Sequence, residues 1–232
     1  MTRTSDRWLD LLGFATLILI IVGLYMAFLY AQTEVNMGLV YRIFFFHFGS
    51  IAAGMLAVIV VGIASIAYLR TNARKWDRVA EASAEIGVVF STIGLITGSI
   101  WARPIWGVWW TWDPRLTTFL ILWLIYIAYL MLRASARDDP RVARFAAVFG
   151  IIGVANVPIV IMSARIWRGI SPVLFQQTAD QQITFGLTPE MVQSLVVCII
   201  AHLFLYFYIL AYRTRLDSLR DQLVELRRAR AQ

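Results

Sequence analysis

Six long apolar blocks, separated by short charged runs, constrain this sequence more than any other feature. The blocks lie at residues 9–30, 40–69, 84–101, 116–132, 145–163 and 191–212. A helix needs about 20 apolar residues to cross the hydrocarbon core of a bilayer. Only 15% of the residues are charged, where a soluble domain carries roughly 25%. The sequence therefore predicts an all-α, polytopic integral membrane protein with six transmembrane helices in one membrane domain, residues 1–212.

Arginine and lysine divide the segments between these blocks into two alternating sets. Sixteen of the 21 basic residues fall in one set, and the other holds only Arg42, Arg103, Arg115, Arg165 and Arg168. Basic residues concentrate in the cytoplasmic segments of membrane proteins. We therefore expect both termini in the cytoplasm, with segments 101–118 and 164–190 on the external side. The net charge of +7 then reflects topology, and no nucleic-acid partner is expected.

Other features of the sequence limit how the chain can be organised. Cys198 is the single cysteine, which excludes an intrachain disulfide, a thiolate zinc cluster and a C-x-x-C-H haem-attachment motif. The first block is too long for a signal peptide and is read as a retained span. Residues 164–190 are too polar to cross the membrane and are expected to fold partly against its surface.

After the last block, residues 213–232 predict a cytoplasmic amphipathic helix, which lies on lipid headgroups or docks on a partner. Its leucines recur every three or four residues, at Leu216, Leu219, Leu223 and Leu226.

The segment between the third and fourth blocks is unusually rich in tryptophan. It reads WARPIWGVWWTWDPRLT and contains five of the nine tryptophans, Trp101, Trp106, Trp109, Trp110 and Trp112. Counting from Pro104, a common first-turn residue, Trp106, Trp109, Trp110 and Asp113 share one face of a predicted short interfacial helix. Asp113 followed by Pro114 predicts the N-cap and first turn of the fourth span.

Two interpretations of these tryptophans remain open from the residues alone. Tryptophan concentrates at membrane–water boundaries in any membrane protein, so the segment could belong to an aromatic belt. Alternatively, an aromatic platform flanked by arginines suits a large planar apolar ligand with acidic edges. Rings stack on the face of such a ligand, and guanidinium groups pair with its carboxylates.

The segment WGVWWTWDPRLT closely resembles the "WWD" signature of the haem-handling proteins of cytochrome c biogenesis, W-G-x-x-W-x-W-D-x-R-L-T. YRIFFFH, at the start of the second block, is similar to the segment of that family that bears a haem-ligating histidine. NVPIVIMSARIW is similar to the end of its fifth span. Within the superfamily, the length and the six spans resemble CcmC rather than the usually larger CcmF and CcsA.

This resemblance implies a carrier that binds haem b transiently and non-covalently at the external face of the membrane. It implies delivery of haem to the chaperone CcmE, in concert with the ABC-type subunits CcmA and CcmB and the small protein CcmD. The sequence has no G-x-x-x-x-G-K-[ST] phosphate loop, so ATP hydrolysis would have to come from such a partner. Two alternatives are a CcsA-like haem lyase, or cytochrome c synthase component, and a small-molecule transporter whose tryptophans form only a belt.

The chain has two histidines. His47 lies near the external end of the second block, on the same side as the tryptophan segment, and is the candidate axial ligand of haem iron. The alternative is a histidine that is hydrogen-bonded to a neighbouring helix. His202 lies about 12 residues beyond Glu190, roughly 18 Å below the outer surface at 1.5 Å per residue. We expect His202 to be structural or to line a path, and not to share an iron with His47.

The resemblance departs from the family pattern at one point. CcmC proteins resemble one another in a second ligating histidine in the outer loop before the sixth span, and here that place falls near Ser171. The second axial ligand is therefore open. Iron could be five-coordinate, bind weakly to Met162 or Met191, take a ligand from a partner, or be held mainly by packing.

The role assignments follow from these patterns as hypotheses. His47 would bind the iron, and Asp113 would fix the corner and pair with Arg115. Candidates for the haem propionates are Arg42, Arg103 and Arg115, each of which could instead reach lipid phosphates. The aromatic platform would consist of Trp106, Trp109, Trp110 and Trp112.

Overall fold

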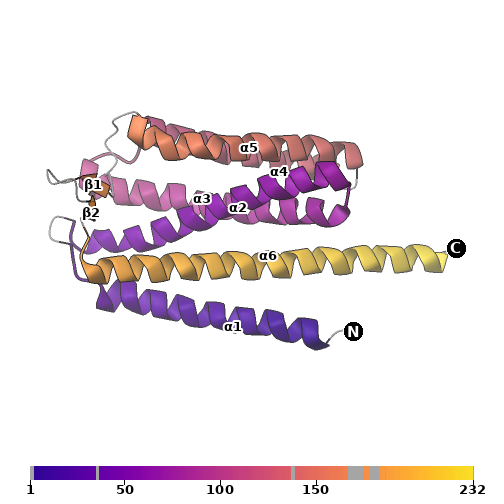
Figure 1. Ribbon diagram of the computed structural model, residues 1–232, viewed down its shortest axis with the longest axis horizontal. Coiled ribbons are helices and arrows are strands. Elements are labelled where there is room, and N and C mark those ends of the chain that lie inside the picture. Colours follow the sequence, from indigo (N-terminus) through magenta and orange to yellow (C-terminus); the bar gives the residue numbers. More distant parts are fainter. Residues whose placement is uncertain are drawn as a thin grey trace.

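The computed structural model describes residues 3–34, 37–136, 139–166, 175–177, 183–185 and 187–231. These residues form six long helices and a small sheet, shown in Figure 1. A π-helical turn, Met26–Tyr30, extends the first helix, and a 3₁₀ turn, Leu39–Arg42, precedes the second. The elements are α1 (Arg3–Tyr25), α2 (Ile43–Thr71), α3 (Arg74–Trp106), α4 (Pro114–Ser135), α5 (Pro140–Ile166), β1 (Phe175–Gln177), β2 (Ile183–Phe185) and α6 (Pro189–Ala231).

The six predicted spans are confirmed as helices. Each of the six is long and apolar enough to cross a bilayer. Their outward faces carry many exposed large hydrophobic side chains, as lipid-facing helices require. The third helix is longer than its apolar block, because it begins at Arg74 with two turns of mixed polar residues before the apolar part starts.

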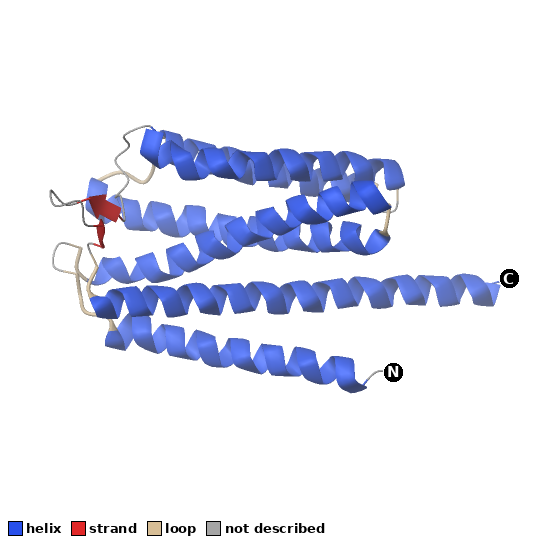
Figure 2. Cartoon of the chain, viewed as in Figure 1, coloured by secondary structure: helices blue, strands red, loops and turns tan. Residues whose placement is uncertain are grey.

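The helices form a bundle with the sheet at one end. Helix α6 packs between α1 on one side and α2 and α3 on the other, while α4 and α5 pack together against α2 and α3 (Figures 1 and 2). Both chain termini lie at the end of the bundle opposite the sheet (Figure 1). We call these the sheet end and the tail end. The cytoplasmic location of the tail end remains a prediction from the arginine distribution.

Small residues let α2 and α3 approach closely. A methyl group built on Gly54 of α2 would lie 3.0 Å from the Ser91 hydroxyl of α3, and one on Gly87 would lie 3.0 Å from Cβ of Ala57. Deeper in the same interface, Ser83 donates a hydrogen bond to the Ala57 carbonyl at 2.9 Å. Close backbone packing through small side chains is the usual way in which membrane helices associate without a hydrophobic driving force. This contact fixes α2 relative to α3.

The expected short interfacial helix is absent from residues 107–113. Helix α3 instead continues through Pro104 to Trp106 and ends at Gly107, whose backbone is left-handed at φ 74° and whose N–H donates to the Arg103 carbonyl. A glycine in this conformation is a common helix stop. No helix then forms until Pro114, so Trp106, Trp109, Trp110 and Asp113 do not share a helical face.

Two further segments can be compared with their predictions. In the loop before α6, β1 and β2 pair antiparallel with Phe175 opposite Phe185, which adds a two-stranded sheet to an otherwise helical protein. Ser171, the place of the missing family histidine, lies outside the described residues. Residues 213–231 continue α6 without a break, so the leucine-bearing tail is an extension of the last span and runs past the other helices (Figure 1).

Candidate functional site at the sheet end

His47 lies in the first turns of α2, where that helix packs against the end of α3. Its ring lies against Gly98, because a methyl group built on Gly98 would come within 3.0 Å of His47 Cε1. The ring centroid is 6.0 Å from that of Trp101 and 5.6 Å from that of Phe48. The imidazole is thus held between two helices at the sheet end.

One ring nitrogen of His47 has a partner on α3. His47 Nδ1 lies 3.1 Å from the hydroxyl oxygen of Thr97. Among the described residues, His47 Nε2 has no hydrogen-bond partner. The alternative interpretation of a histidine bonded to a neighbouring helix is therefore met at Nδ1, while Nε2 forms no hydrogen bond among the described residues.

Trp101 connects this histidine to the tryptophan segment. Its side chain is buried, with its ring 5.6 Å from Phe44 and 6.2 Å from Trp106 between centroids. The cluster around it also includes Tyr41 and Met191, so residues from α2, α3 and α6 meet there. A continuous aromatic contact therefore runs from His47 through Trp101 to the last residue of α3.

The remaining tryptophans of the segment lie between α3 and α4, in residues 107–113, which we call the tryptophan turn. Trp109 is 59% exposed and Trp112 is 74% exposed, while Trp110 is half-buried and meets Trp112 edge to face at 5.8 Å. An exposed pair beside a half-buried one leaves large apolar area uncovered at the sheet end. Exposed aromatic area of this kind marks a contact with membrane or ligand.

The predicted corner at Asp113 is present. The Asp113 carboxylate accepts a hydrogen bond from the Leu116 N–H at 3.0 Å, which caps α4, and Pro114 occupies the first turn. Its other oxygen accepts from the Thr111 hydroxyl at 3.3 Å. Asp113 therefore fixes both the start of α4 and the end of the tryptophan turn.

The three candidate arginines have different surroundings. Arg42 donates to the Phe28 carbonyl and lies over the Phe28 ring at 5.9 Å, beside the extended end of α1. Arg103 donates to the Gly107 carbonyl and closes the end of α3. Arg115 is half-buried near the start of α4, where its charge acts on both Asp113 and His47. Arg115 is the one of the three that the fold brings toward the histidine.

Several buried polar atoms at this end have no partner among the described residues. They include the indole nitrogens of Trp101 and Trp110 and the hydroxyl of Thr117. Buried donors and acceptors are nearly always satisfied in folded proteins. Their concentration around the tryptophan turn fits a site that a ligand with polar edges completes.

His202 lies closer to the level of His47 than its position in the sequence indicated. It packs against Gly49 of α2, only two residues from His47, and its ring lies 6.4 Å from Phe46 and 6.1 Å from Phe90. Two residues correspond to about 3 Å of rise and roughly 200° of rotation. His47 therefore projects from one face of α2, and His202 of α6 packs against another face of that helix. His202 Nδ1 donates to the Cys198 carbonyl at 2.7 Å, which supports a structural role.

The two candidate methionines differ in position. Met191 is 3% exposed and packs in the cluster around Trp101, whereas Met162 is 51% exposed on α5. Among the described residues, no contact between His47 and either methionine is observed. The second axial ligand therefore stays open.

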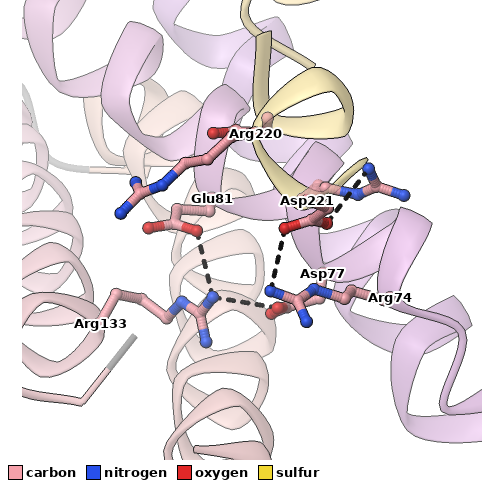
Figure 3. A pocket seen from close by; sticks show the side chains of 8 residues that line it. Arg74, Asp77, Glu81, Arg133, Arg220 and Asp221 are labelled. Atoms are coloured by element: carbon pink, nitrogen blue, oxygen red, sulfur yellow. Dashed lines mark hydrogen bonds and ion pairs between the residues drawn. The ribbon is translucent and has the colours of Figure 1, made fainter. Parts of the chain in front are cut away.

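A charged cleft lies at the opposite, tail end of the bundle. Arg133 of α4 is buried and pairs with Asp77 at 3.0 Å and Glu81 at 3.1 Å, while Asp221 of α6 pairs with Arg74 at 3.2 Å (Figure 3). These pairs tie α4 and α6 to the beginning of α3. The cleft is separated from His47 by most of the length of α3.

Two residues that contact His47 were missed by reasoning from the sequence. Thr97 and Gly98 lie one turn before Trp101 on α3, inside an apolar block. The available signal was modest: a hydroxyl and a glycine adjacent to one another, one helical turn from a tryptophan. Their contact with a residue about 50 positions away depends on the tertiary structure.

Comparison with known proteins identifies the family of this chain. The family model "Heme exporter protein C" matches residues 1–229. The chain is 39% identical to heme exporter protein C of Bradyrhizobium diazoefficiens over 71% of this chain and 62% of that protein. It is 29% identical to the Haemophilus influenzae protein of the same name over 94% of this chain and 88% of the other, and 35% identical to that of Escherichia coli K12 over 73% and 70%. The chain therefore belongs to the CcmC family of heme exporter proteins.

Proposed function

We propose that this protein binds haem b at the sheet end and presents it on the external face of the bacterial inner membrane. The single observation that carries the proposal is the position of His47. Its imidazole is held by α3 next to the tryptophan turn, with Nε2 free of partners among the described residues. Imidazole is a standard axial ligand of haem iron, and aromatic side chains and arginine suit the porphyrin face and the propionates.

The surrounding residues have distinct proposed roles. The face of the porphyrin is covered by Trp106, at the end of α3, and by the tryptophan turn, which contains Trp109, Trp110 and Trp112. Asp113 holds the turn in place through its cap on α4. Arg115 is the favoured partner of a propionate, because Arg42 and Arg103 already donate to backbone carbonyls. Arg42 and Arg103 contribute positive charge at the rim.

The bound haem is cargo for another protein. Haem held non-covalently beside exposed tryptophans, at 59% and 74% exposure for Trp109 and Trp112, is accessible to a second carrier. We propose that this carrier is a CcmE-type haem chaperone of cytochrome c maturation. The protein works with CcmA, CcmB and CcmD, and the ATPase CcmA supplies the ATP hydrolysis for which this sequence has no phosphate-loop motif. It is a carrier rather than an enzyme.

Haem content of the purified protein tests the proposal. We expect His47→Ala to lower the haem that co-purifies with the full-length protein on the order of tenfold, as loss of an axial ligand predicts. Trp110→Ala should also lower it, and the Soret band should shift in both variants. His202→Ala is the matched control, because its Nδ1 is occupied by the Cys198 carbonyl and its ring faces another side of α2.

Two results would contradict the proposal. Haem content at the wild-type level in both His47→Ala and Trp110→Ala would remove the site. A loss of axial ligation in His202→Ala with none in His47→Ala would move the site to the other face of α2. Transfer is tested separately, by mixing the haem-loaded protein with a CcmE-type chaperone and measuring the haem that the chaperone then carries.

A further inference from the structure

The hydrogen bond between His47 and Thr97 has a definite direction. The Thr97 hydroxyl oxygen lies 2.7 Å from the Ile93 carbonyl and 3.1 Å from His47 Nδ1. A carbonyl oxygen can only accept, and a hydroxyl carries one hydrogen and two lone pairs. The Thr97 hydrogen is therefore donated to Ile93 within α3. A lone pair then faces the imidazole, so the hydrogen between Thr97 and His47 must be carried by Nδ1.

We infer that Thr97 is a positioning residue for His47, which holds the imidazole with Nδ1 protonated and so leaves the lone pair of Nε2 for haem iron. The inference rests on the proposed function, since it concerns how the imidazole meets the iron. Histidines that bind metals usually donate their second ring N–H to a nearby acceptor, which fixes the tautomer and raises ligand basicity. Thr97 supplies that acceptor from the neighbouring helix, and the Gly94 carbonyl of the same helix lies beside it.

Gly98, next to Thr97, completes the support of the ring. A methyl group on Gly98 would lie 3.0 Å from His47 Cε1 and 3.6 Å from Nδ1, so the imidazole lies directly on the α3 backbone. Trp101 lies one turn further along α3, with its ring 6.0 Å from the imidazole. Thr97, Gly98 and Trp101, all within about one turn of α3, thus bond, support and flank the same side chain. The ring is positioned before haem arrives, so little conformational entropy is lost when it binds.

The α2–α3 interface also explains why Thr97 can do this. The two helices approach closely through small residues, such as Gly54 and Gly87, deeper in the bundle. That approach brings a side chain as short as threonine within hydrogen-bond distance of a histidine on the other helix. Thr97 donates back to its own helix at Ile93, so its orientation does not depend on the histidine.

A pair of substitutions at Thr97 tests the inference. Thr97→Val keeps the shape of the side chain and removes the acceptor, while Thr97→Ser keeps the hydroxyl. In the full-length protein loaded with haem b, we expect Thr97→Val to weaken haem binding on the order of 10- to 100-fold, as loss of such a partner does. Its haem should also have a more positive midpoint reduction potential, because a less basic imidazole donates less to ferric iron. Thr97→Ser should restore both values.

Thr92→Val is a matched control on the same helix. Thr92 donates to the Val88 carbonyl at 2.7 Å and accepts from the indole nitrogen of Trp123 at 2.8 Å, the same arrangement directed at α4. It should leave the potential unchanged. An unchanged affinity and potential in Thr97→Val, or an equal change in Thr97→Ser, would overturn the inference. Thr97→Ala serves the same comparison where the valine variant does not fold.

The proposed function and this inference fail in different ways. Should His47→Ala keep the wild-type haem content and spectrum, the proposed site itself is wrong. Should His47→Ala lose haem while Thr97→Val matches the wild type in affinity and potential, His47 is the ligand and only the role of Thr97 is wrong.

Discussion

At the scale of single residues, the three candidate arginines illustrate what tertiary structure adds to a sequence. The sequence placed Arg42, Arg103 and Arg115 on one side of the membrane and gave no order among them. In the structure, the first two donate to backbone carbonyls, of Phe28 and Gly107, while the charge of Arg115 acts on His47. A guanidinium that is tethered to a backbone carbonyl keeps its other N–H donors, but it is less free to adopt the paired geometry that a carboxylate prefers.

Arg115→Gln should therefore weaken haem binding more than Arg103→Gln. Hydrogen bonds to charged groups contribute about 1.5–3 kcal/mol, which corresponds to roughly 10- to 100-fold in affinity. Titration of the purified variants with haem b measures this difference. Haem dimethyl ester, which lacks the propionate charges, should bind the wild type and Arg115→Gln equally. A larger loss in Arg103→Gln, or an equal loss with the ester, would contradict the assignment of Arg115 to a propionate.

The same scale shows which site residues a sequence can reveal. His47 and Asp113 were predicted because each is chemically unusual for its place: an ionisable side chain in a span, and an acid directly before a proline. Thr97 and Gly98 were not predicted, because threonine and glycine are ordinary in membrane helices. Their role follows only from the neighbouring helix, which brings His47 against them.

At the scale of elements, the corner between α3 and α4 separates what local rules predict from what they do not. The start of α4 was predicted, because an aspartate cap and a first-turn proline act within a few residues. The helix expected over the tryptophans was wrong. Gly107 adopts a left-handed conformation that ends α3 within the expected helix, and the Arg103 side chain and backbone both bond around it. Periodic spacing alone does not reveal such a stop.

Asp113→Ala should loosen this corner. Loss of an N-cap costs about 0.5–2 kcal/mol of stability, and the tryptophan turn and Arg115 lose a fixed position, so haem occupancy should fall as well. Chemical unfolding in detergent and haem content measure the two effects. Asp113→Asn keeps a good cap and should retain most of the stability.

Asp139→Ala is the matched control for this corner. Asp139 also precedes a proline, at the start of α5, and its carboxylate accepts from the Arg141 N–H at 2.8 Å. It lies at the tail end, so its loss should lower stability by a similar amount without changing haem content. Equal haem loss in Asp139→Ala and Asp113→Ala would show that general destabilisation, rather than the corner, governs binding.

At the scale of the whole molecule, α3 connects two regions of opposite character. Its last turns contact His47 of α2 and contribute Trp101 to the aromatic cluster, and its first turns carry Asp77, Glu81 and Glu85. The number of spans was predictable, since bilayer thickness sets the length of each apolar block. The relation between distant helices was not. For this reason the depth of His202, counted along α6 alone, differed from its observed position beside Gly49.

The acidic turns of α3 hold the tail end together. Arg213 of α6 pairs with Glu85 at 2.8 Å, and Arg74 and Arg78 pair with Asp221, so the extension of α6 is fixed along α3. The leucines of this extension, such as Leu223 and Leu226 at 57% and 60% exposure, remain uncovered. A straight helix fixed in this way extends from the bundle along the direction of the last span (Figure 1).

Arg133 is the residue on which the tail end should depend most. The residue is 2% exposed, and one nitrogen of its guanidinium pairs with both Asp77 and Glu81. Removing one member of a buried ion cluster costs about 3–5 kcal/mol, because the remaining charges stay buried without compensation. Arg133→Ala should lower the free energy of unfolding in detergent by that amount, with no change in the Soret band of protein that remains folded.

Two further variants distinguish buried charge from loss of side-chain volume. Arg133→Met combined with Asp77→Asn and Glu81→Gln removes all three charges and should recover most of the lost stability, because apolar or neutral replacements of buried ion clusters are often tolerated. Arg144→Ala removes an exposed arginine that bonds Asn72 at 3.0 Å, and it should cost under about 1 kcal/mol. If the triple variant were as unstable as Arg133→Ala, packing rather than charge compensation would hold this end of the bundle. If Arg133→Ala altered the haem spectrum, the two ends of α3 would be coupled rather than independent.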